Sequence, residues 1–314
     1  MMDRQVPPSM LAFPTVPCSE GNVLANFFEL PGKPAQIDQE EFLTLVAAPR
    51  DIRSKIYVPP ILVGPEFPKH RVVGCHFIEV SFTRTSIERF EFTDCTFTSC
   101  LFIGTIFKDC RFAGCLFIDC NTYRIEFTGV HVDPLSFEQC LNPEKHQNIG
   151  VHLYQELLYN SRRQSQPDFA QDALFRFHQW LRFQLIYMLR QPGVSWRDYF
   201  KLVPQIAFNW MFYFFLGYGV RLRNYIGTAL FVTAIFVTAN YCFIPQFGLN
   251  ITNESASERF VAALYFTIVT LTTVGYGDIT PQAPLGRIII SVEAISGFVL
   301  MALLVSMIYR KIQP

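Results

Sequence analysis

Residues 92–117 read FTDCTFTSCLFIGTIFKDCRFAGCLF, with a phenylalanine at every fifth position. The five-residue spacing extends from Phe67 to Phe137, and Thr122 is the one polar residue among its members. An α-helix repeats every 3.6 residues and a β-strand every two, so neither element explains this spacing. A fixed short repeat is typical of a solenoid, in which each unit buries its apolar side chain by stacking on its neighbours.

A second set of side chains precedes each central position by two residues and contains seven of the nine cysteines: Cys75, Cys95, Cys100, Cys110, Cys115, Cys120 and Cys140. Zinc sites bring cysteines together as close pairs, unlike the Cys-x4-Cys spacing of this segment. Free cysteine is also among the most frequently buried residues. We therefore expect reduced cysteines that fill the core, in preference to a metal site.

Residues 61–141 resemble the pentapeptide-repeat family in this pattern. The resemblance implies a right-handed quadrilateral β-helix with four pentapeptides per coil and both sets of side chains pointing inward. Residues twenty apart would then stack at about the 4.8 Å spacing of neighbouring strands. The formal net charge is zero, and the two signs are interspersed along the repeat, so we expect no nucleic-acid partner and no mimicry of DNA.

Three other segments flank the repeat before the strongly apolar region. Prolines break residues 1–60, which predicts an irregular segment with one short helix near residues 39–48. Residues 150–200 return to helical periodicity around Pro167 and predict a cytoplasmic helical hairpin. Its excess of basic residues suits either anionic lipid headgroups or a solvated helix face. Residues 201–224, rich in aromatic side chains, predict an interfacial helix or linker.

The remaining part, residues 225–314, contains two stretches that are long and apolar enough to cross a bilayer. Residues 225–245 carry no charge, and residues 285–309 contain Arg287 and Glu293 as their only charged side chains. Basic residues precede the first stretch and follow the second, so the positive-inside rule predicts two spans with both chain ends in the cytoplasm. Without a recognisable signal peptide, we expect a multi-pass protein of the cell (inner) membrane with a cytoplasmic repeat domain.

Between the two spans, residues 272–278 read TTVGYGD and follow a short apolar segment, residues 258–270. That segment is too short to cross and predicts a half-helix that stops midway in the membrane. A cation crossing lipid must exchange its water for other oxygen ligands, which backbone carbonyls can supply if they point to one side. Alternate residues must then be left-handed, and Gly275 and Gly277 can adopt that conformation at little steric cost.

The segment from Ala263 to Pro281 resembles the pore signature of bacterial two-helix potassium channels. The resemblance implies K⁺ as the permeant ion and a filter formed by Thr273, Val274, Gly275, Tyr276 and Gly277. The first four would coordinate K⁺ through their carbonyl oxygens, with the Thr273 hydroxyl added at the inner end and Tyr276 packed outward as a spacer. Thr272 would support the filter, and Asp278 would stand at its outer mouth. We expect a homotetramer in the lipid bilayer, because one quarter of a pore cannot conduct, and no cofactor.

Two residues of the second span are further candidates. Glu293 is an acid inside the membrane, and we expect it either to hydrogen-bond behind the filter near Thr267 or Thr270, or to be a protonated structural acid. Gly297 is a candidate gating hinge, or else a small residue for close helix packing. A second Gly-Tyr-Gly, residues 217–219, lacks the preceding threonines and predicts a turn before the first span.

Together these features predict an all-α two-span pore module joined to a β-helix, with potassium-selective conduction as its function. The order of repeat, hairpin and pore also resembles bacterial channels joined to pentapeptide repeats. The alternative is a membrane-tethered scaffold, in which the repeat domain binds a partner and the pore module is an anchor. No catalytic constellation is present, so we do not expect an enzyme. Without an arginine ladder for voltage sensing, we expect any regulation, including that by an unknown cytoplasmic regulator, to reach the first span through residues 203–224.

Overall fold

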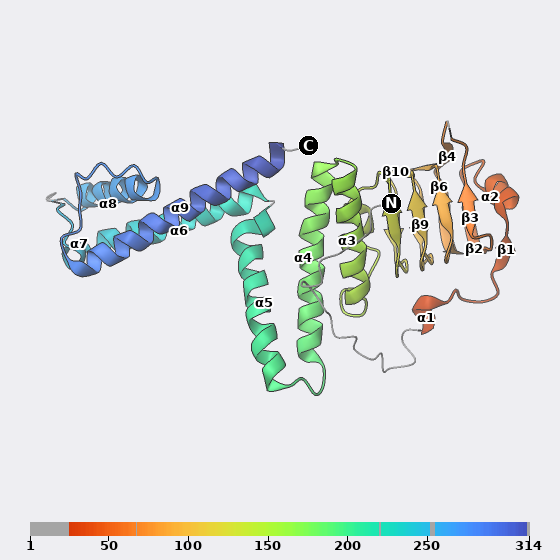
Figure 1. Cartoon of the computed structure of the whole chain (residues 1–314), viewed down its shortest axis with the longest axis horizontal. Coiled ribbons are helices and arrows are strands. Elements are labelled where there is room, and N and C mark those ends of the chain that lie inside the picture. Colours follow the sequence, from red (N-terminus) through yellow and green to blue (C-terminus); the bar gives the residue numbers. More distant parts are fainter. Residues whose placement is uncertain (1–24, 67, 220, 252–254, 313–314) are drawn as a thin grey trace, which may run out of the picture.

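The structure is a computed structural model, and it describes residues 25–66, 68–219, 221–251 and 255–312. Its parts follow one another in space in the order of the sequence (Figure 1). A β-solenoid is followed by two packed helices, then by a third helix alongside them, and finally by a long arm of apolar helices. This order confirms a solenoid joined to a helical region with two candidate membrane spans.

Short parallel strands form three walls of the solenoid. The first wall contains β1 (Ala35–Ile37), β2 (Asp51–Tyr57), β5 (His76–Ser81), β8 (Thr96–Thr98) and β11 (Leu116–Ile118). The second contains β4 (His70–Val73), β7 (Phe90–Thr93) and β10 (Arg111–Ala113), and the third contains β3 (Ile61–Val63), β6 (Ser86–Glu88), β9 (Ile106–Lys108) and β12 (Glu126–Thr128). Isolated bridges from Ser81 to Leu101 and from Leu101 to Asn121 make the fourth wall.

Aromatic ladders run through the interior with the predicted twenty-residue register. Phe77 pairs with Phe97 and Phe97 with Phe117, and the rings of each pair stack with centroids 4.8 Å apart. Phe137 continues this ladder on Phe117. Stacked side chains of the same kind exclude water along the whole axis, which explains why the repeat is so regular in sequence.

A left-handed residue marks each corner of the coil, two positions after each central residue. These residues are Gly74, Glu79, Arg84, Arg89, Asp94, Ser99, Gly104, Asp109, Gly114, Asp119, Arg124 and Gly129. A side chain in this conformation costs about 1–2 kcal/mol, a penalty that glycine avoids. The corners therefore explain the period of five, and interior stacking offsets their strain.

The solenoid begins before the predicted boundary at residue 61. β1 and β2 lie within the segment predicted to be irregular, and β1 pairs with β2 in parallel. The helix α2 (Gln39–Leu45) lies between them, as the sequence predicted, with the Asp38 side chain capping its first turn. Ile52 pairs with Phe77, which is 25 residues later instead of 20, so an extra five residues enter the early coils before β4. Phe67, the first residue of the series with five-residue spacing, lies outside the residues that the structure describes.

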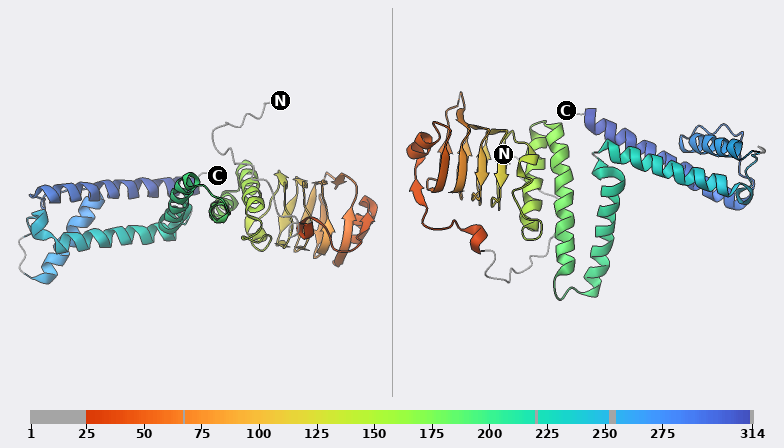
Figure 2. Two further views of the ribbon diagram at one scale, coloured as in Figure 1. Left: turned by 90° about the horizontal axis from the view of Figure 1, so that it is seen from below. Right: turned by 180° about the vertical axis from the view of Figure 1, so that it is seen from behind.

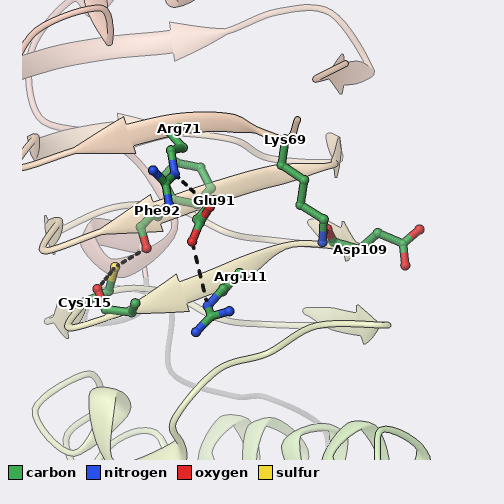
Figure 3. A network of polar contacts seen from close by, with 8 residues as sticks. Lys69, Arg71, Glu91, Phe92, Asp109, Arg111 and Cys115 are labelled. Carbon is green, nitrogen blue, oxygen red and sulfur yellow. Dashed lines mark hydrogen bonds and ion pairs between the residues drawn. The ribbon is translucent and has the colours of Figure 1, made fainter. Parts of the chain in front are cut away.

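The second wall shows how inner and outer side chains are arranged (Figure 3). On the outside, Arg71 and Arg111 each contact Glu91, at 3.1 and 3.8 Å between Nε and carboxylate oxygens. On the inside, the Cys115 thiol donates a hydrogen bond to the Phe92 carbonyl, with Sγ 3.4 Å from the oxygen. Exposed ion pairs contribute at most about 1 kcal/mol each, so the stability of this wall comes from its interior.

The repeat cysteines are all buried and free. Most of their thiols lie close to a backbone carbonyl of the preceding coil, as Cys120 does at 3.3 Å from Phe97 O. Burial raises the pKa of Cys110 to about 11, so this thiol is protonated at neutral pH. These contacts are those of core residues that also satisfy backbone acceptors.

A helical hairpin closes the end of the solenoid that leads to the membrane helices. After α1 (Ala25–Phe28) and the strands come η1 (Pro134–Phe137), α3 (Gln147–Arg163) and α4 (Pro167–Arg190). The buried Asn160 side chain donates to Val130 O at 2.7 Å and accepts from Val130 N at 3.0 Å, so it satisfies the open backbone edge of the last coil. Trp180 of α4 packs directly over Gly150 of α3, which has room for no side chain there.

The apolar arm contains α6 (Leu222–Cys242), α7 (Ile244–Phe247), α8 (Ala256–Leu271) and α9 (Pro284–Ile312). Among the described residues, α6 and α9 are the two helices long and apolar enough to cross a membrane. They correspond to the spans predicted at residues 225–245 and 285–309. The aromatic segment before them forms α5 (Trp196–Leu216), which begins earlier than predicted because Ser195 caps it, and η2 (Gly217–Gly219).

Candidate ion-conducting filter

The end of α8 leads directly into residues 272–278, which have no regular secondary structure. Thr273, Gly275 and Gly277 have φ angles of 59°, 57° and 78°. The predicted alternation of left-handed residues is therefore present at both glycines. Thr273 adds a third left-handed residue to this alternation. A β-branched residue is strained in this conformation, and such strain concentrates at functional sites.

The backbone amides at the start of this segment point back towards α8. The amides of Val274 and Gly275 donate to Val269 O at 3.1 and 3.3 Å, and the amide of Thr273 donates to Thr270 O at 3.0 Å. Among the described residues, no group donates a hydrogen bond to the carbonyl oxygens of residues 273–277. The segment therefore offers a row of free carbonyl oxygens next to the C-terminal end of a helix, whose dipole favours a cation.

The ring of Tyr276, predicted to pack as a spacer, is uncovered in a single copy of the chain. Tyr276 is 72% exposed and Val274 is 53% exposed. The surface of a single copy around the segment is thus uncovered.

Asn250 holds the outer end of the segment in place. Its Nδ2 donates to Asp278 O at 3.0 Å, and its Oδ1 accepts from Thr280 N at 2.7 Å. Asp278 itself is exposed at this end and accepts a hydrogen bond from the Ile279 amide. Sequence reasoning missed the role of Asn250, because the sequence of a loop does not show which backbone groups a side chain will contact.

A buried polar cluster lies behind the other end of the segment. Asn240 of α6 donates from Nδ2 to Thr267 Oγ1 of α8 at 2.9 Å and to Glu293 Oε2 of α9 at 3.0 Å. All three side chains are 0% exposed. Glu293 is therefore near Thr267, as predicted, but Asn240 makes the connection. Sequence reasoning missed Asn240, although an amide in an otherwise apolar span was a usable signal.

Gly297 lies against the last turn of α8. A Cβ atom at this position would overlap the Leu271 carbonyl oxygen, so no side chain fits there. The helix α9 continues without interruption through Gly297. Close packing is thus the observed property of this glycine.

The second Gly-Tyr-Gly is the turn that the sequence predicted. Gly217, Tyr218 and Gly219 all have positive φ angles, and they reverse the chain between α5 and α6. Tyr218 is buried, and its hydroxyl donates to Asn209 Oδ1 at 2.7 Å. The same hydroxyl accepts from Arg182 Nη1 at 3.4 Å, which ties the turn to α4.

Comparisons with known proteins agree with both halves of the chain. Residues 205–313 match the family model described as an ion channel, and residues 63–144 match that of a pentapeptide repeat region. The "Potassium voltage-gated channel protein Shal" of Drosophila melanogaster is 35% identical over 96 residues, which are 30% of this chain and 16% of that protein. The "Hyperpolarization-activated voltage-gated potassium channel" of Methanocaldococcus jannaschii is 41% identical over 59 residues, 19% of this chain and 26% of that protein.

A third relative, the "A-type voltage-gated potassium channel KCND3" of Rattus norvegicus, is 34% identical over 96 residues, 30% of this chain and 14% of that protein. The chain thus matches about a quarter or less of the length of these relatives. No solved structure matches it. The matched pore domain is that of a channel and not of an enzyme. The chain is a membrane protein that carries an ion-channel pore domain related to those of potassium channels, joined to an N-terminal pentapeptide-repeat β-solenoid.

Proposed function

We propose that four copies of this chain form a potassium-selective pore. The alternating left-handed residues Thr273, Gly275 and Gly277 support this most directly, because successive carbonyls can point to one side only if alternate residues are left-handed. Thr273, Val274, Gly275 and Tyr276 would coordinate K⁺ through these carbonyls, with the Thr273 hydroxyl at the inner end. Such oxygens replace the water of a potassium ion without a charged side chain.

The same geometry supports a closed assembly, which we propose to be a tetramer. One segment supplies oxygens on one side of an ion only, and a closed ring of copies supplies the others. The exposed ring of Tyr276 would then pack against a neighbouring subunit as the spacer, with Asp278 at the outer rim. Thr272 supports this arrangement through its hydroxyl, which donates to Ile268 O at 2.7 Å. A scaffold that used the pore module only as an anchor would have no need for this backbone geometry.

The cluster of Glu293, Asn240 and Thr267 would support the filter from behind. Thr267 lies two residues before Val269, whose carbonyl accepts the amides of Val274 and Gly275. A fixed position of α8 therefore fixes the first turn of the filter. The contact of Gly297 with Leu271 braces the same helix end, so any hinge motion at Gly297 would also move this end of α8.

We further propose that the solenoid regulates the pore from the cytoplasm, with both chain ends on that side. Basic residues at 221 and 223, and at 310 and 311, flank the two spans in the sequence and favour this orientation. The helix α4 is the physical connection. Its Arg176 forms an ion pair with Glu138 at the end of the solenoid, and its Arg182 contacts the turn before α6.

Arg182 is well suited to hold that turn. It is 6% exposed, and its guanidinium lies over the rings of Trp210 and Tyr213, at 4.3 and 4.6 Å from their centroids. The imidazole of His178 stacks on Tyr218 beside it, and burial lowers the pKa of His178, so that the ring is neutral at neutral pH. A shift of α4 would therefore move the start of α6.

Ion flux from full-length protein in lipid vesicles tests the selectivity. We expect K⁺ and Rb⁺ to pass and Na⁺ to be excluded. Gly275→Ala should abolish K⁺ selectivity or flux, because a Cβ atom is strained at a φ of 57°. Gly227→Ala is the matched control, since neither Cβ would meet an atom within 4 Å and Gly227 has ordinary helical geometry. Equal Na⁺ and K⁺ flux, or a selective Gly275→Ala channel, would refute the proposal, and no flux would favour the scaffold.

The regulatory coupling is tested by Tyr218→Phe, which keeps the ring and removes the hydroxyl shared by Arg182 and Asn209. We expect altered open probability with unchanged ion selectivity. Tyr159→Phe is the control, because Tyr159 is an exposed tyrosine on α3 that also accepts a hydrogen bond, from Gln155. If Tyr218→Phe gates like the unmodified channel, this turn does not transmit a signal.

A further inference from the structure

The helix α5 has one apolar side that is largely uncovered by the residues that the structure describes. Its exposed members are Trp196, Tyr199, Phe200, Val203, Met211 and Phe214, and Trp210 lies at its edge, 48% exposed, with the Arg182 guanidinium of α4 over its ring. They recur at spacings of three, four and seven residues, which places them on one side of the helix. The charged residues of α5, Arg197, Asp198 and Lys201, lie on other sides. Several aromatic side chains on one uncovered stripe mark an interaction surface.

A different side of α5 is already occupied by α4. Asn209 is buried there and donates to His178 O at 3.4 Å, and Tyr213 lies next to Arg182. This contact orients α5 about its own axis and leaves the aromatic stripe free. The occupant of the stripe must therefore come from outside the described residues of one chain.

The position of α5 indicates which occupant fits. It lies crosswise to α6 and α9, at the end of the arm where α6 begins, with α4 and the solenoid beyond it (Figures 1 and 2). Asn224 of α6 donates to Tyr213 O at 3.2 Å, and Thr228 donates to Phe215 O, so α5 is held to the first turns of the span. Because α6 crosses the membrane, a helix fixed crosswise at its end runs along the membrane surface.

We propose that α5 lies in the lipid interface with its aromatic stripe facing the bilayer. An amphipathic helix in this position buries its apolar face to a depth of about 5–10 Å. Tryptophan and tyrosine favour this region, because their rings are apolar and their N–H and O–H groups reach the headgroups. Arg197 and Lys201 are placed to extend their charges to the headgroups beside the stripe. The opposite contact with α4 then keeps the solenoid close to the membrane, whichever ion the pore conducts.

The three tryptophans of the chain make a direct test possible. Trp196 and Trp210 belong to the stripe, with exposed fractions of 72% and 48%, whereas Trp180 is 5% exposed in the hairpin core. Full-length protein is placed in vesicles whose lipids carry bromine at shallow acyl positions, and the tryptophan emission is measured. We expect strong quenching of the unmodified protein and almost none of the double variant Trp196→Phe/Trp210→Phe, which retains Trp180.

A pair of charge variants separates the stripe from the rest of α5. Phe200→Glu places a carboxylate on the stripe and should reduce the quenching of Trp196 and Trp210. Gln205→Glu places the same charge on an exposed position of another side and should leave the quenching unchanged. Unquenched emission from protein whose spans resist alkaline extraction would overturn the proposal. So would a disulfide between subunits formed by Phe200→Cys, because a second copy of the chain would then cover the stripe.

Discussion

The buried amide of Asn240 joins three helices, and its replacement by leucine gives a sharp test of how the filter is supported. The change removes two hydrogen bonds, of 2.9 Å to Thr267 and 3.0 Å to Glu293. It leaves two acceptors without a donor in a site that is 0% exposed. A buried polar group left unpaired costs about 1–3 kcal/mol, and more if it is charged. Leucine has the same branching and number of side-chain heavy atoms as asparagine, so we expect the lost hydrogen bonds to dominate and Asn240→Leu to lower the free energy of unfolding by about 2–4 kcal/mol.

The double variant Asn240→Leu/Glu293→Leu should recover much of that loss. With both Asn240 and Glu293 replaced by apolar groups, only the Thr267 hydroxyl oxygen has lost its donor, and such paired replacements are often nearly neutral. Stability is measured by thermal unfolding of the detergent-solubilised protein, and function by K⁺ and Na⁺ flux in vesicles. Thr238→Val on the same helix is the control, because Thr238 is exposed and bonds only within α6.

Additivity decides the outcome. If the double variant loses the sum of the two single losses, Asn240 and Glu293 do not interact and the cluster is misassigned. If it is stable but conducts without selectivity or closes rapidly, the cluster supports the filter beyond its contribution to folding. A stable double variant with unchanged selectivity and steady flux would refute the support role of Glu293.

Three further perturbations test contacts elsewhere in the chain. Gly297→Ala should destabilise the protein by about 1–3 kcal/mol in thermal unfolding, because its Cβ meets the Leu271 carbonyl; a pure hinge role would change gating with no loss of stability. Asn160→Leu leaves the amide and carbonyl of Val130 unpaired and should cost about 2–4 kcal/mol in urea unfolding, unless water replaces both bonds. Burial raises the pKa of Cys110 from 9.0 to about 11, so the thiol ionises first in the unfolded chain, and its share of the free energy of unfolding should fall by about 2 kcal/mol between these pH values. Cys110→Ala should have a correspondingly shallower pH dependence of urea unfolding.

The sequence alone was sufficient for features that depend on local geometry. The five-residue period predicted a solenoid, because every corner and every stacked ring is a property of one repeat and its copies, and the resemblance to pentapeptide repeats implied the twenty-residue register. The alternation at Gly275 and Gly277 was predictable for a similar reason, since left-handed conformations are an intrinsic freedom of glycine. The second Gly-Tyr-Gly, residues 217–219, lacks the threonines that precede the filter. The sequence therefore argued against a second filter there and predicted a turn.

Irregularities of the solenoid were harder to predict. The first coil was assigned to an irregular segment, because β1 and β2 lack the phenylalanine pattern and are recognisable only by their pairing. Five extra residues before β4 keep the period of five in the sequence. They nevertheless make β2 pair with residues 25 positions later, whereas β4 pairs with residues 20 positions later. Periodicity counts positions along the chain, and it does not show which positions meet.

The contacts that support the filter were decided only by the tertiary structure. Asn240 meets Thr267 across 27 residues and Glu293 across 53, and Asn250 meets Thr280 across 30. Each of these pairs depends on how separate helices or loops are placed against one another. An amide in a span or a loop has many possible partners, and only packing selects one of them. The sequence therefore determined the repeat and the backbone of the filter, and the packing of α6, α8 and α9 decided which side chains hold the filter in place.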